Sequence, residues 1–386
     1  MTNRLPASLI LPLRLFVALG LLIPLQAAFA QETTPQPQTA NAADEPAVSV
    51  VEEVSAGTVQ SAVPLADSGF WFLSTQHSPQ SFHRNCPQFC PSVSRYEDGL
   101  GYNPSSFADM TASLEPGVPV CIVVHGSFVD TANACRESVC AWNWLRSASQ
   151  GHRMQMISFS WPSYRPLTPL VAMDVNALGH RAARNGYYLA DLLQHIPPEC
   201  PVCLMGHSHG TRVVASALHL MAGGVVEGVY HPTSRVNGRH IRTVFAAAAI
   251  DHNWLNPGKR YGRALCSTQC VLNLHNPADP ALQIYPLRLP LIAKKPLGLH
   301  GLSNWDRRRL GGYANKIVNY NVQRYVGRHH LWPHFFCNTG LAMVVHNYVY
   351  FPDHQPPAAT ISDARPKAVT QPLKLSLADD NHRVIR

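Results

Sequence analysis

The stretch PVCLMGHSHGTR, residues 201–212, constrains the fold more than any other part of the chain. Its apolar start is typical of a short buried strand, and apolar side chains recur at helical spacing from Thr211 to Met221. Between the two, Ser208 stands in a G-x-S-x-G turn, whose strained backbone tolerates only small neighbours. We therefore expect Ser208 at a strand-to-helix turn, with its hydroxyl exposed beside the first N–H groups of the helix.

The remaining pattern alternates between strands and helices, which indicates a mostly parallel sheet. Besides the strand before Ser208, the expected strands are residues 69–75, 118–124, 155–161, 242–250, 271–274 and 316–322. The expected helices are residues 132–148, 175–196, 211–221 and 338–348. The unbroken apolar run 118–124 is typical of a central strand that is buried on both faces. The predicted class is α/β, with helices on both faces of a mostly parallel central sheet.

The two ends of the chain differ from its middle. Residues 1–30 have the form of a signal peptide, with Arg4 and Arg14, an apolar core and a small-x-small cleavage site at 28–30. Residues 31–66 lack periodicity and predict a disordered spacer, residues 67–351 form the folded domain, and residues 352–386 predict a flexible C-terminal tail. We expect an exported protein, whether periplasmic, in the cell envelope or secreted. The mature chain has no apolar run long enough to span a membrane.

The ten cysteines all follow the signal. The pairs Cys86/Cys90, Cys135/Cys140 and Cys266/Cys270 are closely spaced in expected loops, which predicts disulfides in an oxidising compartment. Cys121 and Cys203 lie within apolar strands, where buried thiols are expected. No C-x2-C pair recurs at zinc-finger spacing, and the histidines lack carboxylates at ligand spacing, so we expect no metal and no cofactor.

The charge is uneven along the chain. The total is +8. Residues 1–30 contribute +2, residues 31–66 contribute −5 and residues 352–386 contribute +1, which leaves +10 on residues 67–351. A basic domain favours anionic surfaces or substrates by long-range attraction, so a peripheral contact with the envelope fits this charge. The sequence has no nucleic-acid-binding motif and indicates no clustered Lys/Arg face, so no nucleic-acid partner is expected.

Ser208 is the candidate nucleophile, and a serine needs a base within hydrogen-bond reach. A nucleophile of this kind also needs two backbone N–H groups that stabilise an oxyanion. We expect one from His209, directly after the nucleophile, and the other from Ser127 or Gly126, which follow the strand 118–124.

The acid has two candidates at the ends of later strands. Asp279 follows the second strand after the serine and Asp251 the first, and the strand count favours Asp279. The base should lie after the last strand, where His329, His330 and His334 stand before the closing helix. His334 is ranked first because it is nearest that helix and beside an aromatic pair, followed by His330 and His329.

Five short motifs occur in order: His125-Gly126, FSWPS at 159–163, GHSHGTR at 206–212, AAID at 248–251 and DPAL at 279–282. This series resembles a bacterial α/β-hydrolase family of unknown function, over roughly residues 70–350. The resemblance implies an α/β-hydrolase fold, Ser208 as nucleophile, Asp279 as acid and a late histidine near His334. Position 209 departs from the family, which usually has Met there.

These observations predict an exported serine hydrolase, esterase- or lipase-like, that acts on a small-molecule ester or another acyl substrate through an acyl-enzyme. Peptidase, thioesterase and acyltransferase activities use the same machinery and stay open. The alternative from another class is a non-catalytic envelope protein that binds a partner on this scaffold.

Overall fold

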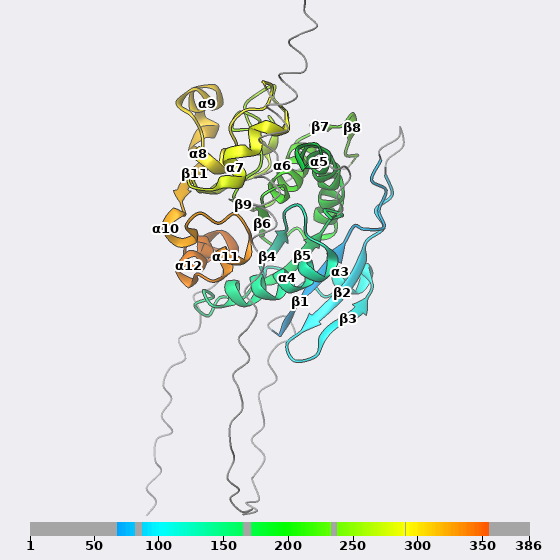
Figure 1. Ribbon diagram of the computed structural model, residues 1–386. Helices are drawn as coiled ribbons and strands as arrows, with labels where there is room; N and C mark the ends of the chain where they lie inside the picture. Colours follow the sequence, from blue (N-terminus) through cyan, green and yellow to red (C-terminus); the bar gives the residue numbers. More distant parts are fainter. Residues whose placement is uncertain (1–67, 82–86, 165–170, 233–237, 290, 355–386) are drawn as a thin grey trace, which may run out of the picture.

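The computed structural model describes residues 68–81, 87–164, 171–232, 238–289 and 291–354. Within them, nine strands form one sheet in the order β11-β10-β9-β6-β4-β5-β1-β2-β3 (Figure 1). The strands are β1 (Gly69–Ser74), β2 (Ser92–Glu97), β3 (Gly101–Ser105), β4 (Val120–Val124), β5 (Gln155–Ser160), β6 (Val202–His207), β9 (Ile241–Ala246), β10 (Cys270–His275) and β11 (Ile317–Asn321). In this spatial order, all neighbouring strands between β11 and β1 are parallel. β2 is antiparallel to both β1 and β3.

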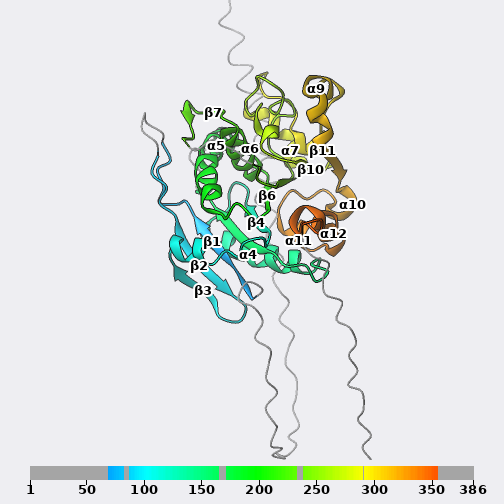
Figure 2. The same cartoon turned by 180° about the vertical axis from the view of Figure 1, so that it is seen from behind.

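Helices cover both faces of this sheet because its central strands are apolar on both sides. In β4, Ile122 joins a core with α5 (Val171–His195) and α6 (Gly210–Met221), while its neighbour Val123 joins a second core with α4 (Thr131–Arg146) and α12 (Thr339–Val349). The two views show α5 and α6 together on one side, and α4 and α12 on the other (Figures 1 and 2). Each β4 side chain is therefore buried, whichever face it points to.

Shorter elements fill the connections. They are α3 (Phe107–Ala112), the hairpin β7 (Val225–Val226) and β8 (Val229–Tyr230), η3 (Ala264–Cys266), α7 (Pro280–Ile284), η4 (Tyr285–Arg288), α8 (Leu297–His300), α9 (Asn304–Leu310), η5 (Gly311–Lys316), α10 (Gln323–Val326) and α11 (Pro333–Phe336). α7, η4, α8 and α9 all lie between β10 and β11.

The expected strands and helices are present, and the arrangement β5-β4-β6-β9-β10-β11 with a serine turn after β6 is the core of the α/β-hydrolase fold. The strand expected at 242–250 ends at Ala246, because Ala247 has a positive φ of 46° that breaks the extended run. The antiparallel strands β2 and β3 lie in segment 77–116, for which no strand was expected. Both strands are mostly polar and half-exposed, so apolar periodicity could not reveal them.

The described residues cover the expected domain, 67–351, almost completely. The predicted signal peptide at 1–30 and spacer at 31–66 lie outside them, and so does the tail from residue 355. No helix in the described ranges has the length and hydropathy to cross a bilayer.

The disulfide expectation is wrong for the described cysteines, all of which are unpaired. Cys135 and Cys140 lie five residues apart on α4, so their side chains point about 140° apart around the helix axis and cannot bond. Cys266 and Cys270 also remain thiols, and Cys86 lies outside the described residues. Cys121 and Cys203 are buried thiols, as expected, and face each other across β4 and β6.

These positions predict an order of thiol reactivity. In the native protein without reductant, an alkylating reagent should label the exposed Cys140, Cys266 and Cys337 first. Cys121 and Cys203 should react only after unfolding, because both are fully buried. Peptide mass spectrometry of alkylated samples measures this order. Protection of Cys140 and Cys266 until a reductant is added would contradict it.

Candidate active site

Ser208 occupies the sharp turn between β6 and α6. Its φ is 50°, a left-handed conformation that few non-glycine residues adopt, and its N–H donates to the carbonyl of Ala246 at 2.9 Å. The flanking glycines are required by close approach. A Cβ on Gly206 would lie 2.8 Å from the Gly210 carbonyl group, and one on Gly210 would lie 2.3 Å from the Val124 oxygen. This packing forces the serine side chain out at the carboxyl end of the sheet.

His330 is the histidine that meets Ser208. Its Nε2 lies 3.0 Å from the Ser208 Oγ, and its Nδ1 lies 2.7 Å from the Asp279 Oδ2. The chemical assignment is that the serine hydroxyl donates to Nε2 while Nδ1–H donates to the carboxylate. The three side chains therefore form one hydrogen-bonded chain, from a buried acid through an imidazole to a hydroxyl.

Asp279 is held by the start of a helix. It is the N-cap of α7, where its Oδ1 accepts from the Leu282 N–H at 3.0 Å, and it is fully buried. Its two oxygens therefore have separate partners, one in the helix and the other in His330. The acid favoured by the strand count is the one that contacts the histidine.

The first-ranked histidine is not at the serine, which corrects the sequence prediction. His334 lies on α11, and its ring stacks on that of His329 with centroids 3.8 Å apart. The ranking assumed that the base lies next to the closing helix, but α11 stands between His330 and α12. The loop between them brings His330 to Ser208.

His207 is a positioning residue that sequence reasoning missed. Its Nε2 bonds the backbone oxygen of His330 at 2.7 Å, and its ring stacks on Trp332 at 4.9 Å. It therefore ties the end of β6 to the loop that carries His330. The signal that could have found it is its position directly before Ser208 in the turn.

Asp251, the alternative acid, has another task. Its carboxylate pairs with the guanidinium of Arg288 and also accepts the backbone N–H of Lys294 at 3.1 Å. Both side chains of this pair are nearly inaccessible to solvent. Asp251 thus anchors the segment after η4 to the end of β9.

The loop of His125, Gly126 and Ser127 lies against the serine. A Cβ on Gly126 would be 3.1 Å from the Cβ of Ser208. The Ser127 hydroxyl lies 2.6 Å from the His209 Nδ1, so the two expected oxyanion segments are joined directly. Among the described residues, the backbone N–H groups of Gly126, Ser127 and His209 have no acceptor, which leaves them available to a ligand.

The FSWPS segment braces this loop. His125 accepts the Trp161 backbone N–H at Nε2, so its Nδ1 carries the proton and donates to the Gly126 oxygen at 2.9 Å. The Trp161 indole donates to the His125 oxygen, also at 2.9 Å. In a planar trans peptide, C=O and N–H point in opposite directions, so fixing the Gly126 carbonyl also fixes the Ser127 N–H. His125 therefore sets the direction of the Ser127 N–H, one of the two expected oxyanion donors.

His209 adds a neutral imidazole beside Ser208. Burial, helped by the cations Arg212 and Arg288, holds the pKa of His209 well below its ordinary 6.5. Its Nε2 is buried and has no partner among the described residues. Arg212 is itself buried, and donates to the Ala249 oxygen and the Tyr285 hydroxyl. Neutrality lets the His209 Nδ1 accept from Ser127.

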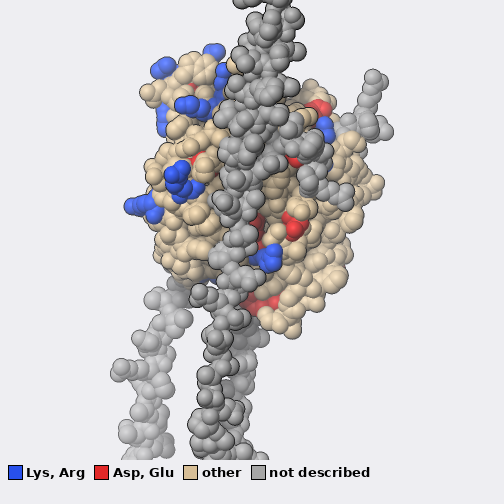
Figure 3. Space-filling model, in the orientation of Figure 1, with Lys and Arg blue, Asp and Glu red and all other residues tan. Residues whose placement is uncertain are grey.

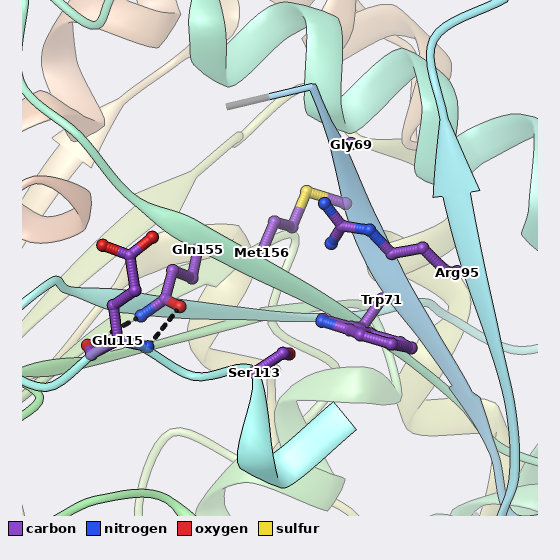
Figure 4. A pocket seen from close by; sticks show the side chains of 7 residues that line it. All are labelled: Gly69, Trp71, Arg95, Ser113, Glu115, Gln155 and Met156. Carbon is purple, nitrogen blue, oxygen red and sulfur yellow. Dashed lines mark hydrogen bonds between the residues drawn. The ribbon is translucent and has the colours of Figure 1, made fainter. Parts of the chain in front are cut away.

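Two hollows lie elsewhere on the described surface. One of about 100 Å³ is lined by Trp71, Arg95, Glu115 and Gln155 among others, at the amino ends of β1 and β5 and therefore at the opposite edge from Ser208 (Figure 4). The other, of about 650 Å³, is an open depression after β11, beside Tyr320 and Arg324. No group of three His, Cys, Asp or Glu side chains suited to a metal occurs in the described ranges.

No protein-family model matches this chain, and no curated protein matches its sequence. Among solved structures, TT1662 from Thermus thermophilus is similar at 13% identity and a TM-score of 0.35, covering 68% of this chain and 96% of that one. A cutinase-like protein from Cryptococcus sp. is similar at 11% identity and a TM-score of 0.28, covering 63% of this chain and 97% of that one. Both likenesses are remote, with TM-scores below 0.5.

The buried histidines predict an acid-sensitive fold. Burial lowers the pKa of His125 from 6.5 to about 4. Below pH 6.5 the unfolded chain therefore takes up a proton that the folded protein binds only near pH 4. The free energy of unfolding should fall as the pH drops through this window, by about 3 kcal/mol from His125 alone.

Urea unfolding at pH 7, 6, 5 and 4 measures this loss. A His125→Gln variant, whatever its stability at pH 7, should lose less on acidification than the wild type. Equal slopes for both proteins would contradict the assignment of a neutral, buried His125.

Proposed function

We propose that this chain is a serine hydrolase that cleaves carboxylic esters through an acyl-enzyme on Ser208. The observation that carries the proposal is the chain from Asp279 to His330 to Ser208, at 2.7 and 3.0 Å, with the serine on a strained strand-to-helix turn. A serine hydroxyl that contacts a buried imidazole–carboxylate pair has the arrangement of an activated nucleophile, which a glycine-rich turn alone does not require.

In the proposed reaction, His330 Nε2 takes the Ser208 hydroxyl proton as Oγ attacks the ester carbonyl carbon. The N–H groups of His209 and Ser127 stabilise the tetrahedral oxyanion, with Gly126 as the alternative donor. The intermediate collapses, and the leaving alkoxide takes the proton from Nε2–H and departs as an alcohol. Water then attacks the acyl-enzyme with His330 again as base, which releases the acid and restores Ser208.

Asp279 holds the Nδ1–H tautomer of His330, so that Nε2 faces the serine, and it stabilises the imidazolium that forms. The mechanism uses side chains, backbone N–H groups and water, and calls on no cofactor. Export rests on the signal-like residues 1–30, and we propose that the enzyme works outside the cytoplasm. Hydrolysis of a thioester or peptide would use the same groups.

Covalent labelling tests the nucleophile and its base. A fluorophosphonate probe should label the wild type and fail to label Ser208→Ala. His330→Gln should slow ester turnover by about a thousandfold or more, because it removes the base. His334→Gln is the matched control, a histidine four residues away that stacks on His329, and it should stay within about tenfold of wild type.

An equal loss in both histidine variants, or a larger one at His334, would refute the assignment of His330. A folded wild type that resists the probe and hydrolyses no short-chain ester would instead support the non-catalytic binding protein.

Substitutions at the two aspartates should affect different properties, turnover at Asp279 and stability at Asp251. Asp279→Asn should lower kcat by about 10³- to 10⁴-fold, because the amide holds the wrong tautomer of His330. Asp251→Asn leaves the buried Arg288 without its partner, so it should lower the free energy of unfolding by about 3 kcal/mol while the folded fraction keeps most of its kcat. Steady-state kinetics and urea denaturation on both variants measure the two effects. The opposite pattern would exchange the roles of Asp279 and Asp251.

A further inference from the structure

The part of the chain after the acid is strongly basic. Residues 280–352 contain nine lysines and arginines but a single acid, Asp306. In the space-filling view, blue cationic atoms gather over α9 and around α10, with few red atoms among them (Figure 3). Asp306 does not offset them at the surface, because it is buried and bonded to His252, Asn256 and Ser303. The positive potential of the domain is therefore concentrated on this side.

Large aliphatic side chains protrude from the same region. Leu291 is 93% exposed and Ile292 is 71% exposed, directly before the exposed Lys294 and Lys295. Leu291 also has a φ of 70°, a conformation that costs a non-glycine residue free energy. An apolar pair held in solvent beside two lysines is unusual for a surface loop.

The α9 helix adds aromatic and cationic side chains. Arg307, Arg308 and Arg309 are exposed, and the Arg309 guanidinium lies 5.1 Å from the ring of Trp305, which is 43% exposed. Among the described residues, no acidic side chain pairs with these arginines or with Lys294 and Lys295. The helix thus presents charge together with an amphipathic ring.

The two segments are fixed side by side. The backbone N–H of His252 donates to the Lys295 oxygen at 3.0 Å, while the His252 ring bonds the Asp306 carboxylate at 2.6 Å. Asp251 holds the Lys294 N–H from the same loop. The backbone of the protruding residues is therefore held in place by these hydrogen bonds. This segment follows α7 and η4 along the chain, and the N-cap of α7 is Asp279.

We propose that this face, made of Leu291, Ile292, Lys294, Lys295 and the exposed residues of α9, docks onto an anionic lipid bilayer. Aliphatic tips would enter the acyl boundary, the tryptophan would lie at headgroup depth, and the cations would meet lipid phosphates. Phosphates of nucleic acid would leave Leu291 and Ile292 in water, and a second copy of the chain would bring like charges together. Docking needs no turnover, so it stands independently of the proposed function.

Vesicle co-sedimentation of the full chain tests the proposal. Wild type should bind vesicles of phosphatidylcholine with about 30% phosphatidylglycerol, bind phosphatidylcholine alone weakly, and lose binding as salt is raised. Lys294→Gln with Lys295→Gln, and separately Leu291→Ser with Ile292→Ser, should each weaken binding by about tenfold or more. All these side chains are exposed, so both variants should keep the wild-type melting temperature.

Leu100→Ser is the matched apolar control, because Leu100 is 73% exposed in the β2–β3 turn. Arg136→Gln on α4 is the matched charge control. Both should bind vesicles like wild type. The proposal is overturned if wild type does not sediment with anionic vesicles, if the face variants bind as well as the controls, or if the face instead carries tighter binding to duplex DNA or RNA.

Discussion

The left-handed backbone of Ser208 is the constraint on which the rest of the site depends. A φ of 50° is tolerable because Gly206 and Gly210 allow β6, α6 and β4 to approach more closely than any side chain permits. That approach directs the hydroxyl toward the loop between α10 and α11. The free energy stored in the turn is offset by burial of β6 and α6, whose residues are almost entirely inaccessible to solvent.

Around this turn, the site is organised by neutral histidines. His207 fixes the backbone of His330, His125 aims the Ser127 amide, and His209 meets the Ser127 hydroxyl. Burial lowers the pKa of His125, His207 and His209, so each keeps one proton and one acceptor nitrogen. A neutral imidazole can bridge a donor and an acceptor, which a cationic one cannot. This accounts for three of the many histidines without invoking a metal.

The sequence predicted the features that depend on local pattern or on order along the chain. The strand–turn–helix of Ser208 follows from apolar spacing and two glycines, and Asp279 follows from counting strands. The choice between His330 and His334 depends on how α10 and α11 turn the chain, and no periodicity encodes that path. The prediction of disulfides was wrong because it took proximity in sequence for proximity in space. On α4, for example, the helix turns Cys135 away from Cys140. No strand was expected in segment 77–116 because β2 and β3 are mostly polar and half-exposed, so they show no apolar alternation.

We propose that Ser208, His330 and the two expected oxyanion segments act as one site. A crystal structure of the protein after reaction with a phosphonate, which imitates the tetrahedral intermediate, tests it most directly. Phosphorus should be bonded to the Ser208 Oγ, with the phosphoryl oxygen about 3 Å from the backbone nitrogens of His209 and of Ser127 or Gly126. His330 Nε2 should lie near the remaining ester oxygen. Phosphorus on another residue, or a phosphoryl oxygen that faces solvent with those N–H groups unengaged, would contradict it.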